Sequence, residues 1–375
     1  MILHRTVLLL GFVFGFGLCG AGFCPVSAQD AFQSLFNGQD LSGWVLVNTP
    51  RDTWSIREGM LVCSGRPTGE LRTERMYQNF ILELEWRHMV PGGNAGIFVW
   101  ADDITARGVP FHRSIEVQVL DHGYGQGKGH TTHGDIFPIH GATLTPVNGR
   151  GGSRAFPTEE RAKASPEWNH YRIECRDGAI SLAVNGKVVT RGTDASPRKG
   201  YICIESEGGT VQYRNLRIQE LPETPVAPEH VAVSSRGYRS IYSGLNLRGW
   251  LPTAAQVPHW QAQDWTLNYD GQAAAAADAV LLSQEAIAER TFLVDVRAGA
   301  GCESVVIAGQ QLSLEQLGGR DWARVELQVR SGRVSIQVNG KQVTADAAAS
   351  QAAFSLSASG PAQFANIYVR ANSAE

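Results

Sequence analysis

Hydrophobic and polar residues alternate along many short segments of this chain, and a period of two predicts β-strands. In residues 80–87 every second residue is apolar, and most of the residues between are charged. Residues 172–175 and 180–184 alternate in the same way, and the dipeptides Asp177-Gly178 and Asn185-Gly186 supply the turns. Helical turns are expected only in residues 159–164 and 272–279. The pattern predicts an all-β chain of the β-sandwich class.

A comparison of the chain with itself reveals two related copies. The segment LFNGQDLSGW (35–44) returns as IYSGLNLRGW (241–250), and WNHYRIECRDGAISLAVNGKVV (168–189) returns as WARVELQVRSGRVSIQVNGKQV (322–343). The offset is far longer than a solenoid repeat, so a whole domain is duplicated. Three prolines in residues 221–228 indicate a semi-rigid linker. We therefore predict two domains, residues 30–221 and 234–375, joined by a linker at residues 222–233.

The first copy contains a segment that the second copy lacks. Between the matched tryptophans the first copy is 52 residues longer, comparing Trp44 to Trp168 with Trp250 to Trp322. Because GIFVW (96–100) matches SVVIA (304–308), the additional residues fall between positions 101 and 167. A possible site is therefore expected in the first copy, and the second copy is expected to be a shortened, non-catalytic relative.

Carboxylate, amide and imidazole side chains gather in this additional segment. Glu116 and Gln118 alternate with apolar residues, so they share the polar face of a predicted strand. Asp121 would join that face if the strand exit shifts the register by one residue. Five of the ten histidines also fall in or beside this segment, namely His112, His122, His130, His133 and His140. A solvated sheet face and surface loop histidines are the simpler alternatives, and no regular metal-ligand spacing appears.

Net charge and cysteine content narrow the partners and the compartment. The formal net charge of −3 gives no indication of a basic surface that would bind nucleic acid or anionic membranes. A basic start, an apolar stretch at residues 7–22 and Val26-Ser27-Ala28 predict a signal peptide over residues 1–28, and hence a periplasmic or secreted protein. Cys175 and Cys203 could pair after export or remain as free thiols.

Several motifs in a fixed order resemble the bacterial 3-keto-disaccharide hydrolase family. They are LFNGQDLSGW, WSIREGMLV, FILELEWR, GGNAGIFV, IEVQVLD and WNHYRIECRDGAISLAVNGKVV. The resemblance covers residues 31–221, and residues 238–370 resemble a shortened second copy. It implies two concanavalin-like jelly-roll β-sandwich domains in tandem, and activity on glycosides whose glucose ring is oxidised at carbon 3. The segment HGDIFPIHGA (133–142) departs from the family pattern, which leaves the details of the substrate open.

This chemistry suggests roles for the candidate residues. A ketone at carbon 3 acidifies the proton on carbon 2, so a base can remove that proton, the group on carbon 1 can leave, and water can then add. We expect Glu116 and Asp121 to divide the acid and base roles, while His133, Asp135 and His140 position the enediol or a divalent metal ion. The residues expected to contact substrate are Gln118, Asn94, Glu85, Arg87, His140 and Trp100. The expected partners are an oxidised glycoside and a separate 3-dehydrogenase that supplies it.

Two other classes of function stay open. The run from Glu116 to Asp121 is similar to the Glu-x-Asp-x-x-Glu strand of laminarinase-type retaining glucanases, which act on unoxidised glucans with two carboxylates about 5 Å apart. Gln118 stands in place of the middle acid of that strand. The nine Trp and nine Tyr would also suit a glycan-binding protein without activity. For the charged residues of strand 80–87, a surface ladder of ion pairs is the alternative to substrate binding.

Overall fold

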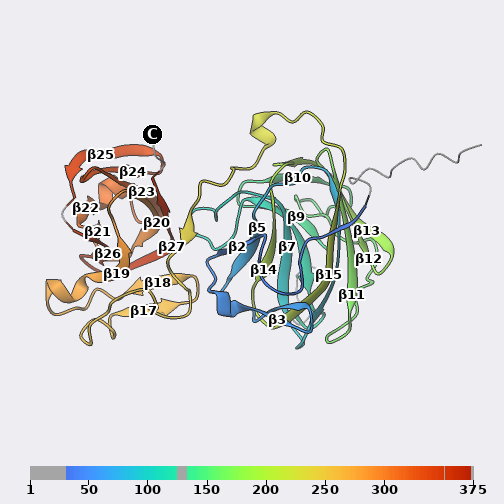
Figure 1. The fold of residues 1–375 in the computed structure, drawn as a ribbon, viewed down its shortest axis with the longest axis horizontal. Helices are drawn as coiled ribbons and strands as arrows, with labels where there is room; N and C mark the ends of the chain where they lie inside the picture. Colours follow the sequence, from blue (N-terminus) through green and yellow to red (C-terminus); the bar gives the residue numbers. More distant parts are fainter. Residues whose placement is uncertain (1–30, 125–132, 350, 373–375) are drawn as a thin grey trace, which may run out of the picture.

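The computed structural model describes residues 31–124, 133–349 and 351–372, and it contains two β-sandwiches side by side (Figure 1). The first sandwich is coloured blue to green and the second orange to red, and the yellow segment joins them. The signal peptide predicted for residues 1–28 lies outside the described residues. No helix in the described part of the chain is long and apolar enough to cross a membrane.

The first sandwich consists of two antiparallel sheets. One sheet has the order β10-β13-β12-β11-β6-β15-β4-β3, with β1 also paired to β15, and the other has the order β2-β5-β14-β7-β8-β9. The strands are β1 (Gln33–Ser34), β2 (Trp44–Val47), β3 (Trp54–Arg57), β4 (Met60–Cys63), β5 (Gly69–Thr73), β6 (Phe80–His88), β7 (Asn94–Ala101), β8 (Ser114–Leu120), β9 (Ile136–Ile139), β10 (Thr143–Pro146), β11 (Asn169–Arg176), β12 (Ala179–Val184), β13 (Lys187–Ser196), β14 (Tyr201–Ser206) and β15 (Val211–Glu220).

The core of this sandwich lies between the two sheets, as the alternating pattern predicts. Leu82, Leu84 and Trp86 of β6 pack in the same buried cluster as Ile97 of β7 and Val117 of β8. Because side chains alternate along a strand, burial of these residues turns their neighbours to the opposite face of each sheet. The predicted all-β jelly-roll fold is confirmed, and strand β8 carries Glu116 and Gln118 on the face away from the core.

The second sandwich is smaller. One sheet has the order β17-β18-β27-β20-β23-β24-β25, with β16 paired to β27, and the other has the order β19-β26-β21-β22. Its strands are β16 (Arg239–Ser240), β17 (Trp260–Gln263), β18 (Thr266–Tyr269), β19 (Leu281–Ala286), β20 (Arg290–Ala298), β21 (Ser304–Ile307), β22 (Gln310–Ser313), β23 (Ala323–Arg330), β24 (Arg333–Val338), β25 (Lys341–Ala348), β26 (Ala353–Ala358) and β27 (Ala362–Ala371). By sheet order β22 takes the place of β8, and β9 and β10 have no counterpart among the described strands.

The helical segments whose bounds fall within the described residues are all short. They are η2 (Arg51–Thr53), η4 (Pro228–His230), η5 (Ala276–Ala279) and α1 (Leu314–Leu317). The expected helical turn near residue 275 is therefore present as η5, but residues 159–164 form no helix. Cys175 and Cys203 are both buried free thiols, and they belong to strands of different sheets.

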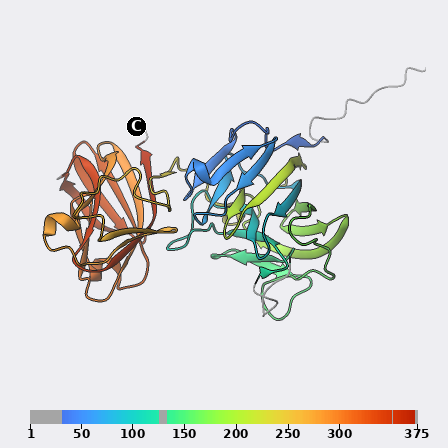
Figure 2. The same cartoon turned by 90° about the horizontal axis from the view of Figure 1, so that it is seen from below.

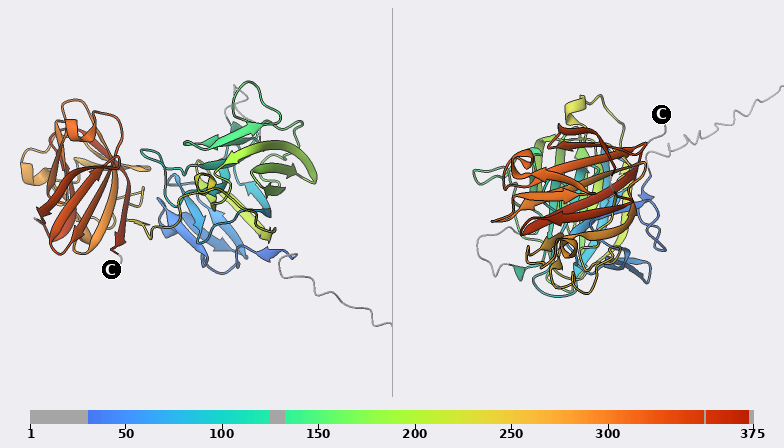
Figure 3. Two further views of the ribbon diagram at one scale, coloured as in Figure 1. Left: turned by 90° about the horizontal axis from the view of Figure 1, so that it is seen from above. Right: turned by 90° about the vertical axis from the view of Figure 1, so that its left-hand side faces the viewer.

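A buried polar network joins the two sandwiches, which lie against each other in Figures 2 and 3. The carboxylate of Asp295, on β20, accepts hydrogen bonds from the Gly108 N–H at 2.8 Å and from Asn366 Nδ2 at 2.7 Å. Arg324 donates to the same carboxylate at 2.7 and 2.8 Å and to the Thr105 carbonyl at 2.9 Å. A Cβ on Gly108 would lie only 2.3 Å from the ring of Trp322, so this approach requires glycine.

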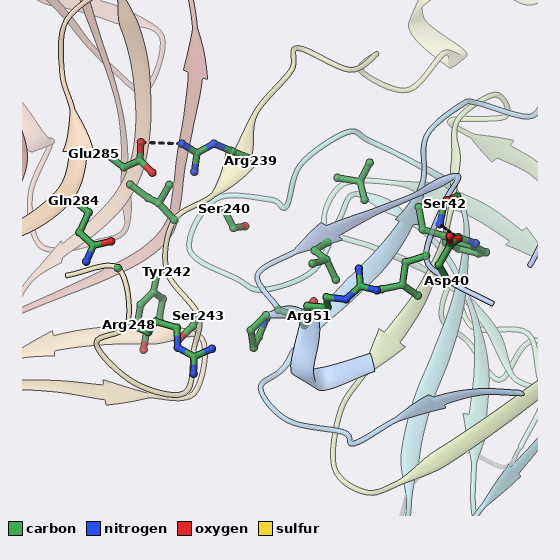
Figure 4. A pocket seen from close by; sticks show the side chains of 18 residues that line it. Asp40, Ser42, Arg51, Arg239, Ser240, Tyr242, Ser243, Arg248, Gln284 and Glu285 are labelled. Atoms are coloured by element: carbon green, nitrogen blue, oxygen red, sulfur yellow. Dashed lines mark hydrogen bonds and ion pairs between the residues drawn. The ribbon is translucent and has the colours of Figure 1, made fainter. Parts of the chain in front are cut away.

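A groove of about 750 Å³ lies between the two sandwiches (Figure 4). Arg51 lines it from the first sandwich, and Arg248 and Gln284 line it from the second. Arg239 and Glu285 also face this groove, where they form an ion pair of 2.8 Å. None of the candidate residues from the sequence lines the groove.

Replacement of Asp295 by Ala should destabilise the protein. The change leaves the Arg324 guanidinium partly buried without its counter-charge, and we expect a loss of about 3 kcal/mol in the free energy of unfolding. Glu303→Ala is the matched control, because its ion pair with Arg320 is exposed and should contribute less than about 1 kcal/mol. Thermal unfolding of both variants measures the difference, and equal small effects would contradict the structural role of this network.

Candidate active site

The polar face of the six-stranded sheet carries a cluster of carboxyl groups. In the sheet register, Glu70 of β5 lies opposite Glu205 of β14, and Gly96 of β7 lies opposite Gln118 of β8. Glu116 lies two residues before Gln118 on β8, so the two side chains point to the same face of the sheet. Glu70, Glu116 and Glu205 expose at most 8% of their surface, which places three acidic side chains in a water-poor environment. Together with Glu207 we call them the carboxyl cluster.

Gly96 provides the space in which two of these groups meet. A Cβ on Gly96 would lie 2.9 Å from Glu205 Oε2 and 3.0 Å from Glu116 Oε1. The two carboxyl groups therefore border the same small volume above the backbone of β7. Any larger residue at this position would displace both of them, which is a physical reason for glycine in the middle of a strand.

Two amide side chains connect the cluster to Glu207, which follows β14. Gln118 Nε2 donates to Asn94 Oδ1 at 2.7 Å and to the Ala95 carbonyl at 3.2 Å. Asn94 Nδ2 in turn donates to the carboxylate of Glu207. Both predicted amides therefore lie beside the carboxyl cluster, with their orientations fixed by hydrogen bonds.

Burial and mutual repulsion keep protons in the cluster. Burial, followed by the charge of Glu207, raises the pKa of Glu116 to about 8, although Arg154 opposes the shift. Burial and the charge of Glu116 raise the pKa of Glu205 well above its usual range, and burial also raises the pKa of Glu207. Adjacent carboxyl groups in such a site cannot all ionise near neutral pH. The raised pKa values therefore favour the protonated forms of Glu116 and Glu205 at neutral pH.

Cationic and aromatic side chains border the cluster. The Arg154 guanidinium stacks 3.3 Å above the Phe137 ring and lies 3.3 Å from Asp135 Oδ2. Tyr124 is 38% exposed, and burial together with the charges of Glu207 and Glu205 raises the pKa of its phenol. A cavity of about 340 Å³ adjoins Arg154, and another of about 510 Å³ adjoins Glu207. Residues 244, 245, 262 and 264 of the second sandwich line the latter cavity.

Asp121 does not join the carboxyl cluster. Its Oδ1 accepts hydrogen bonds from the N–H groups of Gly92 and Gly123 at 2.7 and 2.9 Å, and Oδ2 accepts one from Ser165 N–H at 2.8 Å. Burial alone would raise the pKa of Asp121, but these backbone donors outweigh burial and lower it. The side chain is therefore an ionised anchor for three loop segments, and the structure does not support pairing Asp121 with Glu116.

The predicted histidine and aspartate positions divide between two places. Asp135 is fully buried beside Arg154, and its charge contributes to the raised pKa of Glu116, so it borders the cluster. His133 instead contacts Glu160, at 2.8 Å, and the Leu120 carbonyl, at 2.9 Å. His140 stacks on Phe111, with ring centroids 6.2 Å apart.

Three predicted substrate contacts lie elsewhere. Glu85 pairs with Arg214 at 2.6 Å, and Arg87 donates to Gln212 at 2.8 Å, both on the outer face of the nine-stranded sheet. The core of the sandwich separates that face from Glu116. Glu85 and Arg87 are therefore better explained as members of a ladder of surface ion pairs than as substrate contacts. Trp100 is fully buried, and its indole N–H donates to the Gln78 carbonyl at 2.8 Å. Its ring therefore belongs to the core.

The sequence reasoning missed Glu70, Glu205, Glu207 and Arg154. A signal for Glu205 was present, because it alternates with the core residues Ile202 and Ile204 in the segment YICIES (201–206). The corresponding strand of the second sandwich, β26, carries Ser355 and Ser357 at its positions away from the core. A comparison of residues 201–206 with β26 would therefore have identified a carboxyl group that only the first copy possesses.

Among the residues that the structure describes, two groups of side chains have ligand atoms close enough to share a metal ion. One consists of Glu70, His112 and Cys203, all of them buried, and the other consists of His122, His133 and Glu160. In the first group the His112 Nδ1 contacts the Glu70 carboxylate, and the Cys203 sulfur lies 3.7 Å from the same nitrogen.

Comparison with known proteins gives one family match and several similar structures. The model of the 3-keto-alpha-glucoside-1,2-lyase-like domain matches residues 31–219, half of the chain. Two Parabacteroides distasonis ATCC 8503 structures with a proposed glycosyl hydrolase assignment are 20% and 24% identical, with TM-scores of 0.41 and 0.40. Each covers 51% of this chain, and the matches span 94% and 100% of their own chains. A Bacillus licheniformis β-glucanase is 14% identical over 51% of this chain and 98% of its own, with a TM-score of 0.34. No curated protein matches.

Replacement of Glu116 by Gln should stabilise the protein at alkaline pH. Because the folded state raises the pKa of Glu116 to about 8, its contribution to stability is complete below the unfolded pKa of about 4.3, declines between that pH and 8, and is lost above 8. The amide cannot ionise, so we expect the free energy of unfolding of Glu116→Gln to exceed that of the wild type by about 5 kcal/mol at pH 8. Near pH 4.5 the two proteins should be similar. Denaturant titrations at both pH values test this, and a variant less stable at pH 8 than at pH 4.5, relative to wild type, would contradict it.

Proposed function

The chain belongs to the family of the 3-keto-alpha-glucoside-1,2-lyase-like domain, and from this premise we propose that its first sandwich cleaves 3-keto-glycosides. The proposed reaction is elimination of the group on carbon 1, followed by addition of water. The observation that carries this proposal is the meeting of Glu116 and Glu205 above Gly96, where each carboxyl group has a raised pKa.

In this proposal the oxidised ring lies above Gly96. The amides of Asn94 and Gln118 are oriented beside this position, and their free hydrogen-bonding capacity suits sugar hydroxyl groups. Tyr124 offers a partly exposed ring on which a sugar can stack. The leaving group extends into the cavity of about 510 Å³ beside Glu207, so that the second sandwich forms one wall of the leaving-group site.

The elimination step needs a base at carbon 2 and an acid at the leaving oxygen. Ionised Glu116 removes the proton from carbon 2, and the electrons of that C–H bond form the double bond between carbons 1 and 2. The bond from carbon 1 to the leaving oxygen breaks with its electron pair, and that oxygen takes the proton of Glu205. The guanidinium of Arg154 stabilises the negative charge that develops on the oxygen at carbon 3.

Hydration then completes the cleavage without any oxidant or reductant. Water adds its hydroxyl group to carbon 1, the proton held by Glu116 returns to carbon 2, and the remaining proton of the water restores Glu205. The raised pKa values suit this division of roles. A base with a pKa of about 8 is stronger than an ordinary carboxylate, and Glu205 keeps the proton that the leaving group needs.

Direct hydrolysis by a glucanase-type pair of carboxylates has less support. The second acid of that hypothesis, Asp121, is held by three backbone N–H groups away from Glu116. An assay with the oxidised and the unoxidised forms of one glycoside separates the two mechanisms, since only elimination requires the ketone. Binding of both forms without turnover would favour a glycan-binding protein.

We also propose that the protein acts outside the cytoplasm on glycosides oxidised by a separate 3-dehydrogenase. The support for export is the sequence pattern of residues 1–28, with its apolar stretch and small residues before position 29. Mass spectrometry of the N-terminus of protein recovered from the periplasm or the culture medium tests this proposal.

Glu116→Gln and Glu205→Gln should each lower kcat on a 3-keto-glycoside by about 10² to 10⁴-fold, the usual contribution of a general acid or base. The control is Glu85→Gln, which alters a carboxylate on the outer face of the other sheet and should retain wild-type turnover. Full turnover in both cluster variants, with folding verified by circular dichroism, would contradict the proposed roles.

The pH dependence of kcat/KM should follow the ionisation of Glu116. Because burial raises the pKa of Glu116 to about 8, the ionised form accumulates as pH rises, so kcat/KM should increase from pH 6 towards pH 8. Steady-state rates across this range on one 3-keto-glycoside measure the profile. A maximum below pH 6 would be the signature of an ordinary carboxylate and would exclude Glu116 as the base.

A further inference from the structure

Two histidines and one glutamate converge at the end of the strand that carries the candidate base. His122 Nδ1 lies 2.7 Å from Glu160 Oε1, and His133 Nε2 lies 2.8 Å from the same oxygen. The centroids of the two imidazole rings are only 3.9 Å apart. One carboxylate oxygen of Glu160 therefore faces one ring nitrogen of His122 and one of His133.

The other nitrogen of each ring faces a backbone carbonyl. His133 Nδ1 lies 2.9 Å from the Leu120 carbonyl oxygen, and His122 Nε2 lies 2.8 Å from the Ala162 carbonyl oxygen. A carbonyl oxygen can only accept a hydrogen bond, so these two nitrogens carry hydrogens. In the neutral rings the lone pairs are then on His122 Nδ1 and His133 Nε2, the two atoms that point at Glu160.

This arrangement needs positive charge between the three side chains. With neutral rings, two nitrogen lone pairs face an anionic oxygen, and a second proton on one ring relieves the repulsion for that ring alone. A metal ion would satisfy both nitrogens and the carboxylate oxygen at once, and these three ligand atoms lie within 4.8 Å of one another. We propose that a divalent transition-metal ion, for which Zn²⁺ is the best match, binds between His122 Nδ1, His133 Nε2 and a Glu160 carboxylate oxygen.

The donor set and its surroundings match that class of ion. Two imidazoles and one carboxylate are a common zinc ligand set, and a fourth position remains for water. Zinc-ligating histidines characteristically donate their second N–H to a carbonyl or carboxylate, as the Leu120 and Ala162 carbonyls allow here. The Glu160 side chain is 56% exposed and that of His122 is 33% exposed, so an ion can enter from solvent.

The position of the site suggests a structural role. Leu120 is the last residue of β8, the strand of Glu116 and Gln118, whereas Glu160 and Ala162 belong to the irregular segment between β10 and β11. An ion at this place would fasten the end of β8 to that segment. It is not part of the proton transfers proposed above, so this inference can fail or succeed independently of the proposed function.

Metal binding can be measured on the full-length, untagged protein after chelation and gel filtration. Calorimetric titration with ZnCl₂ should give about one ion per chain, and the melting temperature should rise with added zinc. Glu160→Gln and His133→Ala should weaken zinc binding by more than the roughly 100-fold that loss of an outer partner costs. Glu160→Gln alters a half-exposed side chain, so it keeps the test valid if His133→Ala fails to fold.

Two controls make the result specific. His259→Ala removes a histidine that pairs with Asp270 at 3.0 Å on the second sandwich, and it should bind zinc as tightly as the wild type. Glu116→Gln should also bind zinc normally, whatever its activity. The proposal is overturned if wild-type protein binds no zinc, if Glu160→Gln binds it as tightly as wild type, or if His259→Ala loses it equally.

Discussion

Crowding of carboxyl groups on one sheet face is the constraint on which the rest of this structure depends. Glu70, Glu116 and Glu205 are buried side by side, and Glu207 extends the group to a cavity. An isolated buried carboxylate is costly, and several together cannot all be charged. The arrangement therefore keeps carboxyl groups protonated and lowers the free energy of unfolding. Such perturbed pKa values are common where acid–base chemistry takes place.

The second sandwich resembles the first in architecture and lies beside the carboxyl cluster. The second sandwich retains the β-meander and the core of the first copy, but β26 presents serine hydroxyls on the face where β14 presents Glu205. Its larger sheet joins the first sandwich through Asp295, Arg324 and Asn366, which hydrogen-bond to the backbone of Gly108, Thr105 and Ala106. The Thr68 hydroxyl donates to the Asp264 carboxylate at 2.7 Å, close to the cavity that Glu207 lines. A copy without the cluster thus contributes a wall beside it.

The period-two pattern was sufficient to place Glu116 and Gln118, because burial of Ile115, Val117 and Val119 leaves no choice of face. The same reasoning was insufficient for Asp121, since its partners Gly92 and Ser165 come from distant loops that no local pattern reveals. Glu160 was missed for a related reason. Residues 159–164 have helix-compatible composition but form no helix, so a local pattern does not predict that Glu160 lies against His133.

The central claim, that the cluster holds a proton near neutral pH, can be tested directly by infrared difference spectroscopy of wild type against Glu116→Gln. The account predicts a protonated carboxyl band of Glu116 at pH 6.5, which disappears as pH passes about 8 and is missing from the variant, whereas the band of Glu205 remains in both proteins. Absence of any protonated carboxyl signal above pH 6 would contradict it.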